Sequence, residues 1–178
     1  MRNLLLPLLA LLGACATADP AANHLGGAGD PVRGAALNAP RLLGDTGVYR
    51  NRPADAALAA VQMEVLAEAF LTDPRYAPEA QGSTQHAMRL GRAELRRAIG
   101  IAPDAPPSAV IATLREAAAA MSESRFGRAE AALSGPDVPV GGAEALRRLS
   151  ALPTLPRVAE AAGAAVEEIR QRDAGRRR

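Results

Sequence analysis

Apolar positions recur at helical spacing through residues 53–171, and Pro and Gly residues separate the repeats. Within residues 53–73 one broad face collects six of them: Leu58, Val61, Val65, Leu66, Ala69 and Phe70. Such spacing marks the face of a helix that packs on a core. Pro53 suits a first helical turn and Pro74 cannot continue one, so the pattern predicts a helix between them.

The same reasoning predicts four or five further helices. One begins at residue 83 or 84 and ends at Gly100, and Gly91 within its apolar stripe indicates that a neighbouring helix approaches closely there. Others cover residues 107–121, 143–152 and 156–171, and Thr154 is expected to cap the last of these. Residues 124–133 form either a short helix or a bent continuation of the helix before them.

No run of four to eight residues shows the alternation and β-branching of a strand. Ala accounts for 42 of the 178 residues, which favours helix over sheet. Leu, Ile, Val and Phe make up only 30 of the 164 residues that follow residue 14. We therefore predict an all-α domain, a small Ala-rich bundle of five to six helices, which is marginal or completes its core with a partner.

Residues 15–52 are dominated by Ala, Gly, Pro, Asn and Asp, which break helical periodicity. This composition predicts a flexible tether, because it buries too little apolar surface to offset the entropy of ordering. The last part of the tether is expected to dock on the domain through five apolar side chains: Leu37, Leu42, Leu43, Val48 and Tyr49. Residues 172–178, which include three terminal Arg residues, predict a basic tail.

The chain begins with a short positive end followed by nine apolar residues at positions 4–12. A transmembrane helix needs about 20 apolar residues, whereas the core of a signal peptide needs about 7–15. Residues 12–15 then read Leu12-Gly13-Ala14-Cys15. This tetrad resembles the lipobox of bacterial lipoproteins, in which small residues precede the Cys and a Leu lies three positions before it.

The resemblance implies that residues 1–14 are a signal peptide, cleaved between Ala14 and Cys15. It also implies a diacylglyceryl thioether on Cys15 and an acyl chain such as palmitate on the new amino group, because stable anchoring takes more than one chain. Ala16 rather than Asp follows the Cys, which implies an outer-membrane protein facing the periplasm. Plain secretion, with cleavage at a small-x-small site, is the main alternative, and a cytosolic protein with a chance apolar start is another.

The 21 basic residues, all Arg, nearly balance 19 acidic ones, for a formal net charge of +2. Residues 155–163 resemble the first helix and turn glycine of bacterial helix-turn-helix repressors, which implies DNA binding. Glu167 and Glu168 in the would-be recognition helix, the export signal and the small net charge oppose this interpretation. We therefore expect no nucleic-acid partner.

Candidate chemistry is sparse. The two His residues, His24 and His86, fall in the tether and at a helix start, and the single Cys is assigned to acylation. These residues do not provide a set of ligands for a metal ion. The sequence therefore predicts no metal, cofactor or catalytic residue. The carboxylate pairs, Glu64 with Glu68 and Glu167 with Glu168, are interpreted as solvated helix faces.

Arg89, Arg92 and Arg96 form a positive strip along one predicted helix. Guanidinium groups bind phosphate and carboxylate in bidentate fashion, so the strip could contact lipid phosphate or a peptidoglycan carboxylate. The preferred interpretation is a solvated face, partly neutralised by carboxylates such as Glu64 or Glu68 on a packed neighbour.

Two functions follow from these features. The first is a lipid-anchored envelope protein whose non-enzymatic helical domain binds a protein partner or caps an assembly. The alternative is a lipid-anchored hydrolase or cell-wall-acting accessory. A concave pocket with converging polar groups would favour the alternative, and an exposed apolar patch would favour the interaction domain.

Overall fold

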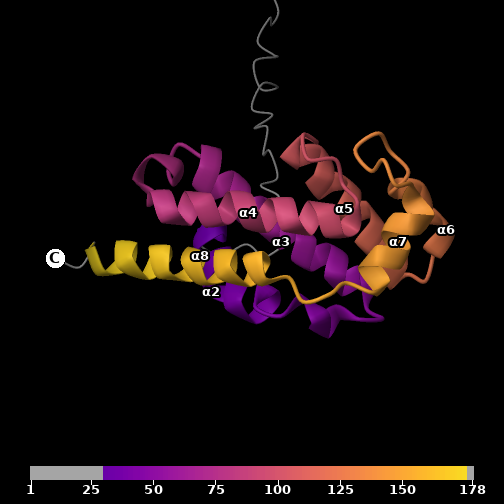
Figure 1. Cartoon of the computed structure of the whole chain (residues 1–178), viewed down its shortest axis with the longest axis horizontal. Coiled ribbons are helices and arrows are strands. Elements are labelled where there is room, and N and C mark those ends of the chain that lie inside the picture. Colours follow the sequence, from indigo (N-terminus) through magenta and orange to yellow (C-terminus); the bar gives the residue numbers. More distant parts are fainter. Residues whose placement is uncertain (1–29, 176–178) are drawn as a thin grey trace, which may run out of the picture.

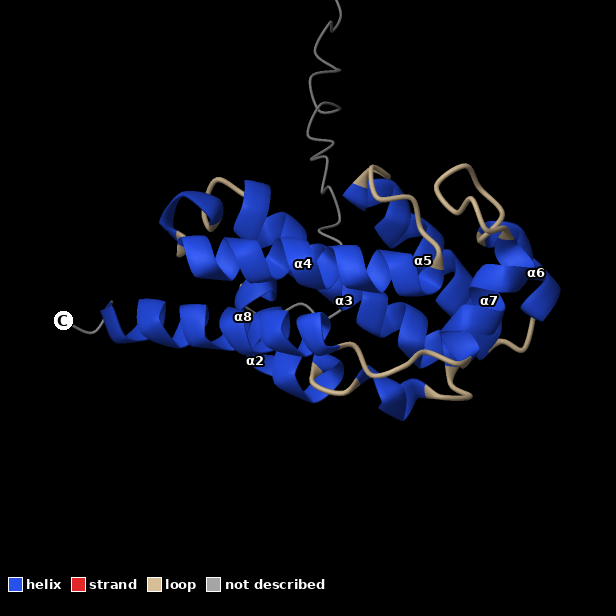
Figure 2. Cartoon of the chain, in the orientation of Figure 1, coloured by secondary structure: helices blue, strands red, loops and turns tan. Residues whose placement is uncertain are grey.

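The computed structural model describes residues 30–175, and every regular element in that range is helical (Figures 1 and 2). The elements in chain order are α2 (Pro31–Leu43), η1 (Thr46–Tyr49), α3 (Pro53–Thr72), η2 (Ala77–Glu79), α4 (Gly82–Ile99), α5 (Pro107–Ser122), α6 (Phe126–Ala132), α7 (Gly142–Ser150) and α8 (Pro156–Gly175). The all-α prediction is confirmed. Seven α-helices within this range exceed the predicted five to six, because α2 forms in the segment expected to be a tether.

Helix α3 is the centre of the bundle and packs against α2, α4, α5 and α7. Its buried residues point in every direction around the helix axis, and Met63, Leu66 and Phe70 are fully enclosed. A helix that is apolar all round is stable only when neighbours cover it on all sides. Helices α5, α6 and α7 gather at one end of the molecule, and the last turns of α8 lie at the other (Figure 1).

Helices α4 and α8 run side by side along the long axis of the molecule (Figure 1). They touch at Gly91, where an added Cβ would lie 2.8 Å from the Cβ of Ala161 and 3.0 Å from the carbonyl oxygen of Arg157. The close approach predicted from Gly91 is therefore confirmed, and the neighbour is α8.

Each of these two helices provides a carboxylate for the first turn of the other. Glu94 on α4 accepts hydrogen bonds from the backbone N–H groups of Arg157 (2.8 Å) and Val158 (3.2 Å) at the start of α8. Glu168 on α8 accepts from the N–H of Gln81 (3.1 Å) and the hydroxyl of Thr84 (3.0 Å) at the start of α4. Carboxylates at these places satisfy exposed N–H groups and complement the helix dipoles, so the two caps fix an antiparallel register.

The predicted cap at Thr154 is wrong. Its hydroxyl donates to Asp45 at 2.7 Å, and the carboxylate of Glu94 occupies the position at the start of α8 that a local cap would fill. The structure thus replaces a cap near in sequence with one from a distant helix.

The predicted tether over residues 15–52 is wrong for its second half. Helix α2 begins after the N-cap Asp30, whose carboxylate accepts from the N–H groups of Val32 and Arg33, and it packs on α3 and α8. Pro31 at the first helical position and Pro40 in the last turn disturb few backbone hydrogen bonds. The buried residues recur at helical spacing and are chiefly small: Val32, Ala35, Ala36, Ala39 and Leu43.

Three further predictions are settled, two in α8 and one after α5. Helix α8 continues through Gly163 without a turn, so the helix-turn-helix interpretation is wrong. Arg172, assigned to the basic tail, belongs to α8, where its guanidinium donates to the carbonyl of Tyr76 at 2.7 Å. Ser124 has a φ of 59° between α5 and α6, so α6 is a separate helix and not a bent continuation of α5.

Candidate functional site

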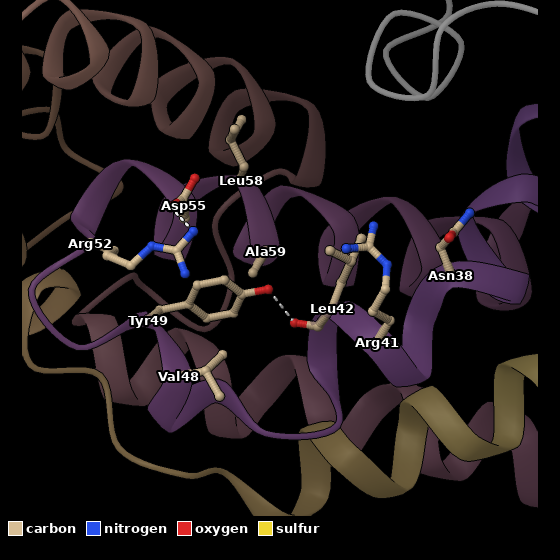
Figure 3. Close-up of a pocket in the computed structure, with 9 residues that line it drawn as sticks. All are labelled: Asn38, Arg41, Leu42, Val48, Tyr49, Arg52, Asp55, Leu58 and Ala59. Atoms are coloured by element: carbon tan, nitrogen blue, oxygen red, sulfur yellow. Dashed lines mark hydrogen bonds and ion pairs between the residues drawn. The ribbon is translucent and has the colours of Figure 1, made fainter.

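The candidate site is a groove of about 570 Å³ where the end of α2, the short helix η1 and the start of α3 meet (Figure 3). Its lining residues are Asn38, Arg41, Leu42, Val48, Tyr49, Arg52, Asp55, Leu58 and Ala59. Sequence reasoning placed Leu42, Val48 and Tyr49 in contact with the domain but missed the groove. The groove requires α2 to fold against α3, whereas the Pro and Gly content of that segment predicts a tether.

An apolar strip runs through the groove. Leu42 and Leu58 are half-buried on the α2 and α3 sides, and the side chain of Val48 is turned outward (Figure 3). Val48 is 53% exposed, which makes it one of three large apolar residues on the described surface. Exposed apolar side chains beside a hollow are typical of a site that a partner covers.

Charged groups border this strip. Arg52 and Asp55 form an ion pair at 2.6 Å, with both side chains partly exposed. Arg41 is exposed on the α2 side and has no ion pair or hydrogen bond within residues 30–175. The lining of the groove therefore has two guanidinium groups and one carboxylate, and Arg52 already pairs with that carboxylate. The net charge of the lining is positive.

The ring of Tyr49 forms part of the floor, and its hydroxyl donates to the carbonyl of Leu42 at 2.6 Å (Figure 3). This bond satisfies a carbonyl in the last turn of α2, where helical partners run out. Burial raises the pKa of the Tyr49 hydroxyl, the nearby Asp55 carboxylate adds to the rise, and Arg41 and Arg52 oppose it. The phenol is therefore a neutral donor that holds η1 against α2.

The predicted anion strip on α4 is divided by the fold. Arg96 is only 4% exposed and pairs with Glu64 through two contacts, at 2.6 Å and 2.7 Å. Its third nitrogen donates to the backbone carbonyls of Pro103 and Ala105, both at 2.9 Å. Arg96 therefore cannot contact an external anion, and that part of the prediction is wrong because the side chain points into the core.

The preferred interpretation of the strip is a solvated face partly neutralised by Glu64 or Glu68: the carboxylate partners are present, but solvation is wrong for Arg96, which is buried. Arg96 pairs with Glu64, and Arg92 lies 3.8 Å from Glu68. Arg89 remains at the surface, 3.4 Å from the side-chain oxygen of Gln85.

The other residues singled out from the sequence also have definite places. Glu64 and Glu168 are buried rather than solvated, since each is paired with groups on another helix. Glu167 is exposed and bonds to Gln171 at 2.9 Å. His86 is exposed in α4, as a solvated residue would be. Cys15 and His24 lie outside the described residues.

Within residues 30–175 no three His, Cys, Asp or Glu side chains cluster closely enough to hold a metal ion. Over the same range, no helix combines the length and hydropathy that crossing a bilayer requires. A second hollow, of about 210 Å³, lies beside Glu168 between α4 and α8. Because Glu168 already accepts bonds from Gln81 and Thr84, its carboxylate is committed to capping.

Comparisons with known proteins returned no match to a family model, to a curated protein or to a solved structure.

Proposed function

We propose that this chain is a lipid-anchored protein of the bacterial cell envelope whose helical domain binds a protein partner through the groove between α2 and α3. The observation that carries the anchor is the position of the single Cys: it stands where a lipobox places the acylated residue, directly after an apolar run of signal-peptide length. The outer membrane, on its periplasmic side, is the proposed destination.

The fold supports a short connection between anchor and domain. Helix α2 brings the start of the domain to Asp30, so 14 residues, 16–29, separate it from Cys15. A chain of this length spans at most about 50 Å. A partner that reaches the groove is therefore a protein of the same membrane or of the adjoining periplasm.

The content of the groove supports binding rather than hydrolysis. Its one lining carboxylate, Asp55, is held by Arg52, whereas acid–base hydrolysis typically uses two carboxylates in different environments. The exposed Val48 beside the hollow is the kind of apolar contact that partner binding buries.

Replacing the acylated residue tests the anchor. Cys15→Ser is expected to block lipid transfer and cleavage after Ala14, so that the precursor accumulates, and globomycin should have the same effect on the unchanged protein. Mass spectrometry of the mature N-terminus gives the readout. An unacylated mature chain that begins at Thr17 or Asp19 would show processing by the general signal peptidase and would refute the anchor.

Site-specific photo-cross-linking in intact cells tests partner binding. With p-benzoylphenylalanine in place of Val48, we expect a discrete adduct with another protein, because this side chain borders the groove and is exposed. His86 is the matched control position, since it is exposed but lies on α4, which contributes no residue to the lining of the groove. The same adducts from both positions, or none from position 48, would contradict the proposed site.

A further inference from the structure

We infer that the groove recognises an extended peptide segment of the partner that carries apolar side chains beside a carboxylate. This inference rests on the proposed function and adds the chemistry of the bound segment. It follows from three features of the groove: its unmatched charge, its apolar strip and a polar side chain suited to a peptide backbone.

The charge of the groove selects an acidic segment. Arg52 is satisfied by Asp55 at 2.6 Å, whereas Arg41 has no carboxylate partner within residues 30–175. A guanidinium group binds a carboxylate through two parallel N–H···O bonds, which fixes orientation as well as adding affinity. Arg41 therefore supplies the docking point for one acidic side chain or for a chain terminus.

The apolar strip favours a bound segment that has apolar side chains next to its carboxylate. Leu42 is adjacent to Arg41 in sequence, and Leu58 and Val48 continue the strip across the groove (Figure 3). An anion of small size, such as free phosphate, would leave these surfaces in water. A segment that places an apolar side chain beside its carboxylate covers both parts.

Asn38 suits the backbone of a peptide. Its amide nitrogen donates to the carbonyl of Gly34 at 3.0 Å, within its own helix. The amide oxygen then remains as an acceptor at the edge of the groove, one helical turn from Arg41. A peptide N–H can donate to it.

The test measures binding of a defined probe to the lipidated full-length protein in detergent. The probe is a fluorescein-labelled peptide of alternating Leu and Glu. The control peptide has Lys in place of each Glu. We expect the Glu peptide to bind about tenfold more tightly than the Lys peptide, and Arg41→Glu to weaken it by about tenfold. Arg97→Glu, the same charge change on the exposed face of α4, should leave affinity unchanged.

Four results would overturn the inference, and the first three are no binding of the Glu peptide, equal binding of the Lys peptide, and full binding by Arg41→Glu with its helical circular dichroism intact. Competition by soluble dihexanoyl phosphatidylglycerol at the concentrations at which the peptide binds would also overturn it, since the site would then recognise an anionic lipid. If the Glu peptide does not bind while the cross-link from position 48 persists, the proposed partner binding is retained and only the inferred chemistry of the bound segment is refuted. Loss of that cross-link would instead remove the proposed function.

Discussion

Arg96→Met is expected to lower the free energy of unfolding by about 3–5 kcal/mol, because it leaves the carboxylate of Glu64 buried without its partner. Glu64 is 2% exposed and Arg96 is 4% exposed, so water cannot replace the lost ion pair. The backbone carbonyls of Pro103 and Ala105 lose their donor at the same time, which adds to the cost. Urea denaturation followed by circular dichroism measures the change.

The double variant Glu64→Leu with Arg96→Met distinguishes the energy of the ion pair from that of the other bonds that Arg96 makes. It removes both charges, so we expect it to be less destabilised than the sum of the two single variants. It does not regain full stability, because the carbonyls that Arg96 satisfied remain without donors. Arg92→Met, at the looser and partly exposed pair with Glu68, is the matched control and should cost less than about 1 kcal/mol. Equal losses from Arg96→Met and Arg92→Met would contradict the central role of the buried pair.

Gly91→Leu is expected to destabilise the domain by about 1–3 kcal/mol, because α4 and α8 have no room for a side chain where they touch. Even a Cβ would lie 2.8 Å from the Cβ of Ala161 and 3.0 Å from the carbonyl oxygen of Arg157. Moving α8 away to relieve this overlap would also lengthen the bonds by which Glu94 and Glu168 cap the two helices. The shift in the urea midpoint gives the measurement.

Gly163→Ala is the matched control on the other helix. Gly163 is exposed in the middle of α8, and an added Cβ would meet nothing within 4 Å. Ala in place of Gly in a helix interior stabilises by about 0.5–1 kcal/mol, so this variant should gain stability. If Gly91→Leu also gained stability, the close contact between α4 and α8 would not exist in solution.

The sequence by itself determined the class of the fold and most of its helices. The apolar run of α3 and the apolar stripes of α4, α5, α7 and α8, with Pro and Gly at their ends, are local patterns, and local backbone preferences set where such helices begin and end. Gly91 in an apolar stripe predicted a closely packed neighbouring helix, and Glu64 and Glu68 were predicted as partners for the Arg strip. The signal peptide and Cys15 are also local features, and they stay predictions.

Only the tertiary structure decided which residues from distant parts of the chain meet. Helix α2 contains Pro31, Gly34 and Pro40, whose types predict a broken segment, and it is ordered because small Ala side chains let it pack closely on α3 and α8. The caps by Glu94 and Glu168, the burial of Arg96 and the groove beside Val48 all join segments far apart in sequence. A local pattern shows that a residue is polar or apolar, but its partner is fixed by the packing of helices, and that packing assigned Arg96 to the core and left Arg41 facing the groove.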